Sequence, residues 1–233
     1  MSQQTSPKPL HVLCFGDSLT EGYSMYGMQW TPYSETLQTR LDEQLGNEWK
    51  VNIDTDGVSG QLVTAGFRKR MEGLYGVKRT RESPYDWVIF LGGTNDLAYS
   101  LSPTKIHDEI KAITALPLET GAKVLLMTVP ECGVKNKKLD ERRNELNSLI
   151  KGDERDGVYT LDLHALIPFH AMPEAERDEI WDDGLHFTPE GYQRVGLLVA
   201  DRLIELLAGD KKAAEDGKDT GDVRSPRNAD GKA

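Results

Sequence analysis

The sequence has few of the features that would assign it to a specialised class of protein. It contains only two cysteines, Cys14 and Cys132, and neither lies in a spacing typical of metal ligands. No apolar run is long enough to span a membrane, and residues 1–9 lack the apolar core of a secretory signal. We therefore expect no metal, no cofactor and no membrane span. We predict a cytoplasmic protein, with secretion of a processed chain left open.

Positive charge is also scarce. Lys and Arg number 28 against 38 Asp and Glu, so the formal net charge is −10. A protein that binds nucleic acids non-specifically needs basic patches to neutralise phosphates, so we do not expect a nucleic-acid partner. A small-molecule substrate, even an anionic one, is compatible with this charge. The sequence does not indicate an oligomeric state.

The composition that remains is that of a globular domain, with 38% apolar and 28% charged residues. Residues 10–208 form one predicted domain. Residues 1–9 are a predicted disordered lead. Residues 209–233 are almost wholly charged or small, with too little apolar surface to offset the entropy of ordering, and we predict a disordered tail there.

Strands and helices alternate along the predicted domain. The predicted strands are 10–15, 51–53, 86–91, 123–129 and 158–163. The helical patterns between and after them begin at Pro32, Gln61, Pro103, Lys137 and Pro189. This alternation indicates right-handed βαβ crossovers. The predicted fold is a flavodoxin-like, three-layer α/β/α domain with a five-stranded parallel sheet.

Several polar residues follow these strands. Ser18 comes directly after the first strand, in Gly16-Asp17-Ser18-Leu19, and Gly60 lies in the loop after the second. Asn95 follows the most apolar strand. Because the carboxyl ends of parallel strands meet at one edge of a sheet, these residues can converge there. Gly-Asp-Ser alone is also a common turn sequence, so the motif needs partners to indicate chemistry.

The partners of a reactive serine are present downstream. A serine hydroxyl is a weak nucleophile that needs a base, usually histidine, which a carboxylate orients. Asp183 and His186 lie three residues apart before the last helix, so the aspartate can hold one imidazole nitrogen while the other faces Ser18. The developing oxyanion needs donors, which the Gly60 backbone N–H and the Asn95 amide can supply.

At these residues the sequence resembles the SGNH (GDSL-type) hydrolases, named for Ser, Gly, Asn and His in successive blocks. The matching stretches are Gly16-Asp17-Ser18-Leu19, Val58-Ser59-Gly60, Gly93-Thr94-Asn95-Asp96 and Asp183-Gly184-Leu185-His186-Phe187. The resemblance implies a serine esterase with Ser18 as nucleophile, His186 as base and Asp183 as its partner. It also implies an oxyanion hole built from Ser18, Gly60 and Asn95. One departure is Thr55, where many members carry asparagine.

The substrate is less well defined by the sequence. We predict that Asp17, Tyr23 and Trp181 contact a small-molecule ester, although Asp17 is also suited to bracing the serine loop. The loop from Thr20 to Tyr33 is rich in Tyr and Met and is either a pocket wall or packing. The alternatives are an acyltransferase or a thioesterase that uses the same site, a flavodoxin-like binding module, and a catalytically silent scaffold.

Overall fold

The computed structural model describes residues 6–75 and 85–219. Its centre is a sheet of five parallel strands in the order β4-β1-β5-β6-β7. The strands are β4 (Trp49–Gly57), β1 (Lys8–Gly16), β5 (Trp87–Leu91), β6 (Lys123–Met127) and β7 (Val158–Leu161). The five-stranded parallel sheet confirms the predicted fold. Its strand order follows from pairings between distant segments, which a local pattern does not reveal.

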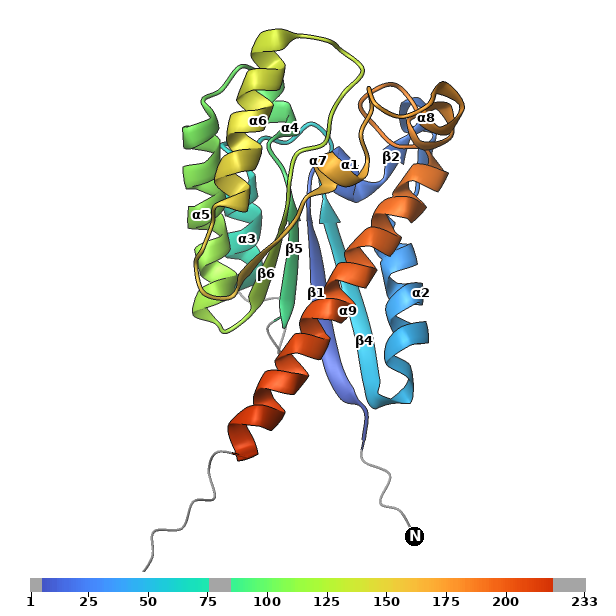
Figure 1. Cartoon of the computed structure of the whole chain (residues 1–233). Coiled ribbons are helices and arrows are strands. Elements are labelled where there is room, and N and C mark those ends of the chain that lie inside the picture. The colour runs from blue at the N-terminus through green and yellow to red at the C-terminus, as the bar shows by residue number, and fades with distance from the viewer. Residues whose placement is uncertain (1–5, 76–84, 220–233) are drawn as a thin grey trace, which may run out of the picture.

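Two layers of helices cover the sheet, one on each face. One face carries α2 (Tyr33–Leu45) and α9 (Pro189–Asp219), and the other carries α3 (Phe67–Tyr75), α5 (Pro103–Glu119) and α6 (Lys137–Lys151) (Figure 1). Successive side chains of a strand point to opposite faces. In β1, Val12 and Cys14 join the first core, whereas Leu13 and Phe15 join the second. A strand that is buried on both faces is apolar on both, as β1 is from Val12 to Phe15.

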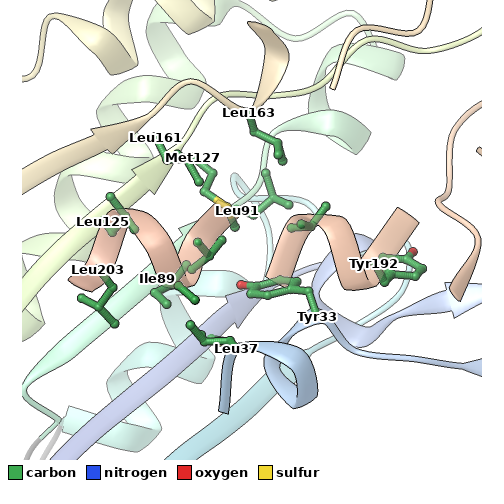
Figure 2. Close-up of a cluster of buried hydrophobic side chains, with 14 of the residues drawn as sticks. Tyr33, Leu37, Ile89, Leu91, Leu125, Met127, Leu161, Leu163, Tyr192 and Leu203 are labelled. Atoms are coloured by element: carbon green, nitrogen blue, oxygen red, sulfur yellow. The ribbon is translucent and has the colours of Figure 1, made fainter. Parts of the chain in front are cut away.

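The core between the sheet and the α2/α9 layer is built from large side chains (Figure 2). Tyr33 and Leu37 of α2 lie against Tyr192 and Leu203 of α9 and against residues of the central strands, all of them buried. The two helices approach closely at Gly196. A Cβ there would lie 2.5 Å from the backbone oxygen of Tyr33, so only glycine fits.

The short elements gather at the carboxyl end of the sheet (Figure 1). They include α1 (Ser18–Glu21), β2 (Tyr23–Ser24), η1 (Met25–Gly27), β3 (Gln29–Trp30), α4 (Thr94–Ala98), α7 (Leu163–Leu166) and α8 (Glu174–Ile180), while η2 (Gly46–Glu48) follows α2. This edge is where open α/β sheets bind their ligands.

Several predicted boundaries are wrong. The strand predicted at 51–53 is the nine-residue β4, because every residue of β1 from Lys8 to Gly16 has a partner on it. The helix predicted from Gln61 begins only at Phe67, because Leu62 bridges to Ala65 and Gly66 instead.

Both ends of the predicted domain also differ from the structure. The final helix continues to Asp219, so residues 209–219 are helical and not disordered; Ala, Glu and Lys are strong helix formers. Likewise the first strand already includes residues 8 and 9. Residues 1–5 and 220–233 lie outside the described residues.

Candidate active site

Ser18 lies at the junction between strand β1 and helix α1. β1 ends at Gly16, and Asp17 caps α1 by accepting a hydrogen bond from the backbone N–H of Leu19 at 3.0 Å. A Cβ on Gly16 would lie 2.5 Å from the Leu91 backbone oxygen, so the motif needs glycine there. The serine that follows is the first residue of α1 and retains 7% exposure. The chain therefore presents one hydroxyl at the edge of the sheet.

His186 lies within hydrogen-bond distance of this hydroxyl, and Asp183 lies on the other side of the imidazole. His186 Nε2 lies 2.9 Å from Ser18 Oγ, and His186 Nδ1 lies 2.8 Å from Asp183 Oδ2. The second oxygen of Asp183 accepts the backbone N–H groups of Leu185 and His186 at 3.0 and 2.8 Å. Partial burial alone would raise the pKa of Asp183, but these N–H groups and the imidazole hold the pKa below its usual value. The carboxylate thus stays ionised and fixes the orientation of the imidazole.

Gly60 and Asn95 lie in neighbouring loops at the same edge. Gly60 has φ +73°, a conformation that favours glycine, and no heavy atom lies within 4 Å of where its Cβ would be. Asn95 is in the first turn of α4, after β5. Its Nδ2 donates to the Gln61 backbone oxygen at 3.0 Å and, more weakly, to Asp17 Oδ2 at 3.4 Å. The Asn95 amide is therefore held between the serine loop and the Gly60 loop.

Two carboxylates that the sequence did not single out for this role brace the Gly60 loop. Glu21 Oε2 accepts both the backbone N–H and the hydroxyl of Ser59, at 2.9 and 2.5 Å. Asp96, which is fully buried, accepts the backbone N–H groups of Val63 and Thr64 at 2.8 and 3.0 Å. Asp96 thus joins α4 to the residues that follow Gly60. The Ser59 hydroxyl is thus bonded to a carboxylate, whereas the Ser18 hydroxyl is bonded to the imidazole of His186.

The sequence does not predict a role for Arg70 of α3, because nothing in a charged helix distinguishes one arginine from its neighbours. Its guanidinium donates to the backbone oxygens of Gly16 and Asp56 at 2.7 and 2.8 Å. It also donates to the side chains of Asp56 and Gln61, at 2.7 and 2.6 Å. Arg70 therefore ties together the ends of β1 and β4 and the residue after Gly60.

Asp17 combines burial with several charged neighbours. Burial raises the pKa of Asp17 to about 7. The N–H of Leu19 lowers it, the charge of Asp96 raises it, and the charge of Arg70 lowers it. The side chain has no exposed surface, so the prediction that Asp17 contacts substrate is wrong. Its contacts with Leu19 and Asn95 instead make it a brace of the serine loop, the role that its position also suggested.

The remaining substrate-contact predictions differ in outcome. Trp181 is 4% exposed and packs against the rings of Phe187 and Phe169, so its predicted contact with substrate is also wrong. The Tyr23 ring lies 4.6 Å from the His186 ring and is partly exposed, so Tyr23 remains a candidate contact. Thr55 bonds to Ser34 of α2 and takes no part in the site.

A cavity lies beside the triad of Ser18, His186 and Asp183, with Asp183 in its wall. The loop from Thr20 to Tyr33 contributes no residue to its lining. The cavity has a volume of about 360 Å³ and is mostly apolar. The lining residues are Thr94, Asn95, Leu97, Ala98, Val129, Pro130, Cys132, Val134, Leu139, Arg143, Asp183, Gly184 and Leu185. The large side chains of the 20–33 loop, by contrast, are exposed at Met25, Tyr26, Met28 and Trp30. That loop is not the wall of this cavity.

Two further predictions concern metals and membranes. Within residues 6–75 and 85–219, no group of three or more His, Cys, Asp or Glu side chains is arranged to hold a metal ion. No helix in the same described ranges is long and apolar enough to cross a bilayer. Cys14 and Cys132 are both buried free thiols.

Together, the three-layer fold and the groups at its carboxyl edge define an α/β/α hydrolase. The chain belongs to the GDSL-like lipase/acylhydrolase family, whose model matches residues 14–194. The match confirms the resemblance noted in the sequence. No curated protein matches the chain closely enough to add to this assignment.

Solved structures of similar fold include a lipase/acylhydrolase from Enterococcus faecalis, with TM-score 0.64 and 20% identity over 83% of this chain and 95% of that one. The aryl esterase of M. smegmatis has TM-score 0.62 and 20% identity over 84% and 99% of the two chains. A carbohydrate acetylesterase family member from Sinorhizobium meliloti has TM-score 0.62 and 21% identity over 85% and 99%. At these identities the likeness establishes the fold.

Proposed function

We propose that this hydrolase cleaves carboxylic esters through an acyl-enzyme on Ser18. The observation that carries the proposal is the continuous chain of hydrogen bonds from Ser18 Oγ through the His186 ring to Asp183, at 2.9 and 2.8 Å. A base within hydrogen-bond reach of a serine, itself oriented by a carboxylate, is what activates a serine nucleophile.

The reaction follows from these positions. Ser18 Oγ attacks the ester carbonyl while His186 Nε2 takes the hydroxyl proton, and Asp183 stabilises the imidazolium that forms. His186 then returns the proton to the departing alcohol. Water then attacks the carbonyl carbon of the acyl-enzyme while His186 takes one of the protons of the water. The bond between this carbon and Ser18 Oγ breaks, His186 returns the proton to Ser18 Oγ, and the acyl group leaves as the free acid.

Three donors are proposed for the oxyanion: the backbone N–H groups of Ser18 and Gly60 and the side-chain amide of Asn95. Gly60 fits this role because its exposed face carries no side chain to obstruct a substrate. Asn95 fits it because its amide borders both the serine loop and the cavity. A single such donor contributes about 10²–10³-fold in turnover in well-studied hydrolases.

The substrate that we propose is a small-molecule ester with a short acyl group. The cavity of about 360 Å³ borders both Asn95 and Asp183, and its lining is mostly apolar. Such a lining suits an acyl chain. We also propose that Tyr23 contacts the ester, because its ring lies beside the His186 ring and is partly exposed.

Substitution of the nucleophile tests the proposal. Ser18→Ala should lower turnover of p-nitrophenyl acetate or butyrate by roughly 10⁴–10⁶-fold, because no hydroxyl remains to form the acyl-enzyme. Ser102→Ala is the matched control, since Ser102 is exposed and its side chain makes no capping bond to α5. Turnover by Ser18→Ala at the rate of the control would contradict the proposal.

The same residues would also serve an acyltransferase or a thioesterase. Product analysis separates them: hydrolysis yields the free acid in the presence of added alcohols, whereas a transferase yields a new ester. A thioester substrate of equal acyl length, run beside the oxygen ester, compares the leaving groups directly.

A further inference from the structure

Arg143 is a buried cation in the wall of the cavity beside the triad. It lies on α6, and its side chain is 6% exposed. The same cavity is lined by Asn95 and Asp183. Asp183, Asn95 and Arg143 thus line one cavity, although they come from distant parts of the chain.

The hydrogen bonds of this guanidinium are incomplete. Nη1 donates to Asp140 Oδ1 at 2.7 Å, and Nη2 donates to the sulfur of Cys132 at 3.1 Å. A thiol sulfur is a weak acceptor, and a guanidinium has five N–H groups to satisfy. Among the described residues no oxygen is bonded to Nη2. Burying a charged group is costly unless its donors are satisfied, so an oxygen that enters the cavity at this point would be bound well.

The charges around the cavity indicate whether the oxygen that binds Arg143 would be charged or neutral. Asp140 already pairs with Arg143, so the pair carries no net charge. Asp183, which also lines the cavity, adds a negative charge. A second carboxylate would be repelled there, whereas a neutral carbonyl oxygen can accept from Nη2 without that repulsion. The remaining wall, with Leu97, Val129 and Leu139 among its residues, suits the carbon part of the same group.

We propose that Arg143 makes the enzyme selective for acyl groups that carry a neutral hydrogen-bond-accepting oxygen beyond the ester carbonyl, such as keto-acyl groups. The proposal rests on the esterase function proposed above. Arg143 acts here as a specificity-determining residue, and the bond-making steps at Ser18 stay the same.

Three phenyl esters of equal heavy-atom count in the acyl group test this selectivity. Phenyl isocaproate ends in two methyl groups, phenyl levulinate replaces one methyl with a keto oxygen, and monophenyl succinate ends in a carboxylate. Acid release is followed by pH-stat titration, with the enzyme-free rate subtracted. The wild type should hydrolyse the levulinate with a kcat/KM on the order of tenfold above the isocaproate, the effect of a hydrogen bond to a charged donor. The succinate should be the poorest substrate.

Variants attribute the preference to Arg143. Arg143→Met should reduce the levulinate-to-isocaproate ratio to about one, because the side chain keeps its bulk and loses its donors. Arg142→Met is the matched control: Arg142 is the adjacent residue, bonds to Leu97 and Ser100, and does not line the cavity. Its ratio should equal that of the wild type. Each ratio compares two substrates on the same variant. A loss of folded protein therefore lowers both rates by the same factor and leaves the ratio unchanged.

A second variant serves if Arg143→Met does not fold. Cys132→Ser leaves the arginine in place and gives Nη2 a stronger acceptor inside the protein, so the levulinate preference should fall. A wild-type ratio near one, or a ratio that survives both substitutions, would overturn the proposal while leaving the esterase function intact. A wild-type preference for the succinate would overturn the choice of a neutral oxygen. If the wild type hydrolyses none of the three esters and no p-nitrophenyl ester, the proposed function fails and this inference fails with it.

Discussion

At the scale of single residues, the buried carboxylate of Asp17 holds the loop that carries Ser18, but its ionisation lowers the stability of the folded protein. Its carboxylate caps α1 through Leu19 and receives the amide of Asn95, yet it has no contact with solvent. Burial raises its pKa to about 7, and Asp96 adds to the effect. A carboxylate that must ionise in such surroundings stabilises the geometry of the loop while it destabilises the folded state.

Asp17→Asn should therefore increase stability at high pH. In the unfolded chain the pKa of Asp17 has its ordinary value of 3.8, and in the folded protein it is about 7. The folded state thus binds more protons between these values, so the contribution of Asp17 to stability falls as pH rises from about 4 to 7. Asparagine keeps an oxygen for the Leu19 N–H and carries no charge. At pH 8 the gain should be at most roughly 4 kcal/mol, the equivalent of the shift in pKa.

Urea unfolding of both proteins at several pH values measures this effect. The gain from Asp17→Asn should shrink toward zero as pH falls to about 4 and below, where the carboxyl becomes protonated in the unfolded chain as well as in the folded protein. Should the wild type become more stable relative to the variant as pH rises, the ionised Asp17 would be stabilising and the interpretation would be wrong.

At the scale of elements, α3 supports the site through one side chain. Arg70 reaches from this helix to the ends of β1 and β4, and its guanidinium lies 4.3 and 4.8 Å from the ring centroids of Phe15 and Phe67. The strand ends carry the Ser18 and Gly60 loops. The distance between Ser18 and Gly60, the proposed nucleophile and the proposed oxyanion donor, thus depends on a helix to which we assign no catalytic group.

Arg70→Met should lower kcat for p-nitrophenyl butyrate by roughly ten- to a hundred-fold, because small displacements of catalytic groups cost that much. KM should change less than kcat, since the cavity does not include this residue. Arg68→Met is the matched control on the same helix, because Arg68 makes an exposed pair with Glu109. Partial recovery of kcat in Arg70→Lys would support a positioning role. Equal kcat values for the Arg70 and Arg68 variants would argue against it.

The contact between α2 and α9 makes a prediction about stability alone. A Cβ at Gly196 would lie 2.5 Å from the Tyr33 backbone oxygen and 2.7 Å from the Thr36 Cβ, so Gly196→Ala forces the helices apart. Overpacking of this kind costs about 1–3 kcal/mol. Gly209→Ala in the same helix is the control, because nothing lies within 4 Å of its added methyl group.

The two variants should move the melting temperature in opposite directions. Gly209→Ala should raise it slightly, since alanine favours a helix by roughly 0.5–1 kcal/mol over glycine, whereas Gly196→Ala should lower it. A Gly196→Ala protein that melts at or above the wild-type temperature would show that the helices separate without cost.

At the scale of the whole molecule, local patterns predicted the fold class and the motif residues. The apolar runs are continuous because the central strands are buried on both faces, and Ser18, Asp183 and His186 belong to short motifs. The strand order and the full length of β4 depend on pairing with β1, which no local pattern contains. The helix beyond residue 208 was missed because charged sequences are typical of both disorder and exposed helices.

The supporting residues of the site were not predictable for a related reason. Glu21, Arg70 and Arg143 are ordinary charged residues in helices, and only the folded chain shows their partners. The predicted contact between Trp181 and substrate rested on its position next to the Asp183 motif in the sequence, whereas its ring is buried in the core. Adjacency in sequence does not establish which side chains face the substrate.

The central claim is that Ser18, activated by His186, is the nucleophile of this hydrolase. The most direct measurement is covalent labelling with a fluorophosphonate probe, followed by peptide mass spectrometry to locate the adduct. We expect a single adduct on Ser18 in the wild type, and we expect it to be lost in both Ser18→Ala and His186→Ala. An adduct on another serine such as Ser59, or no adduct on an enzyme that hydrolyses esters, would contradict the account.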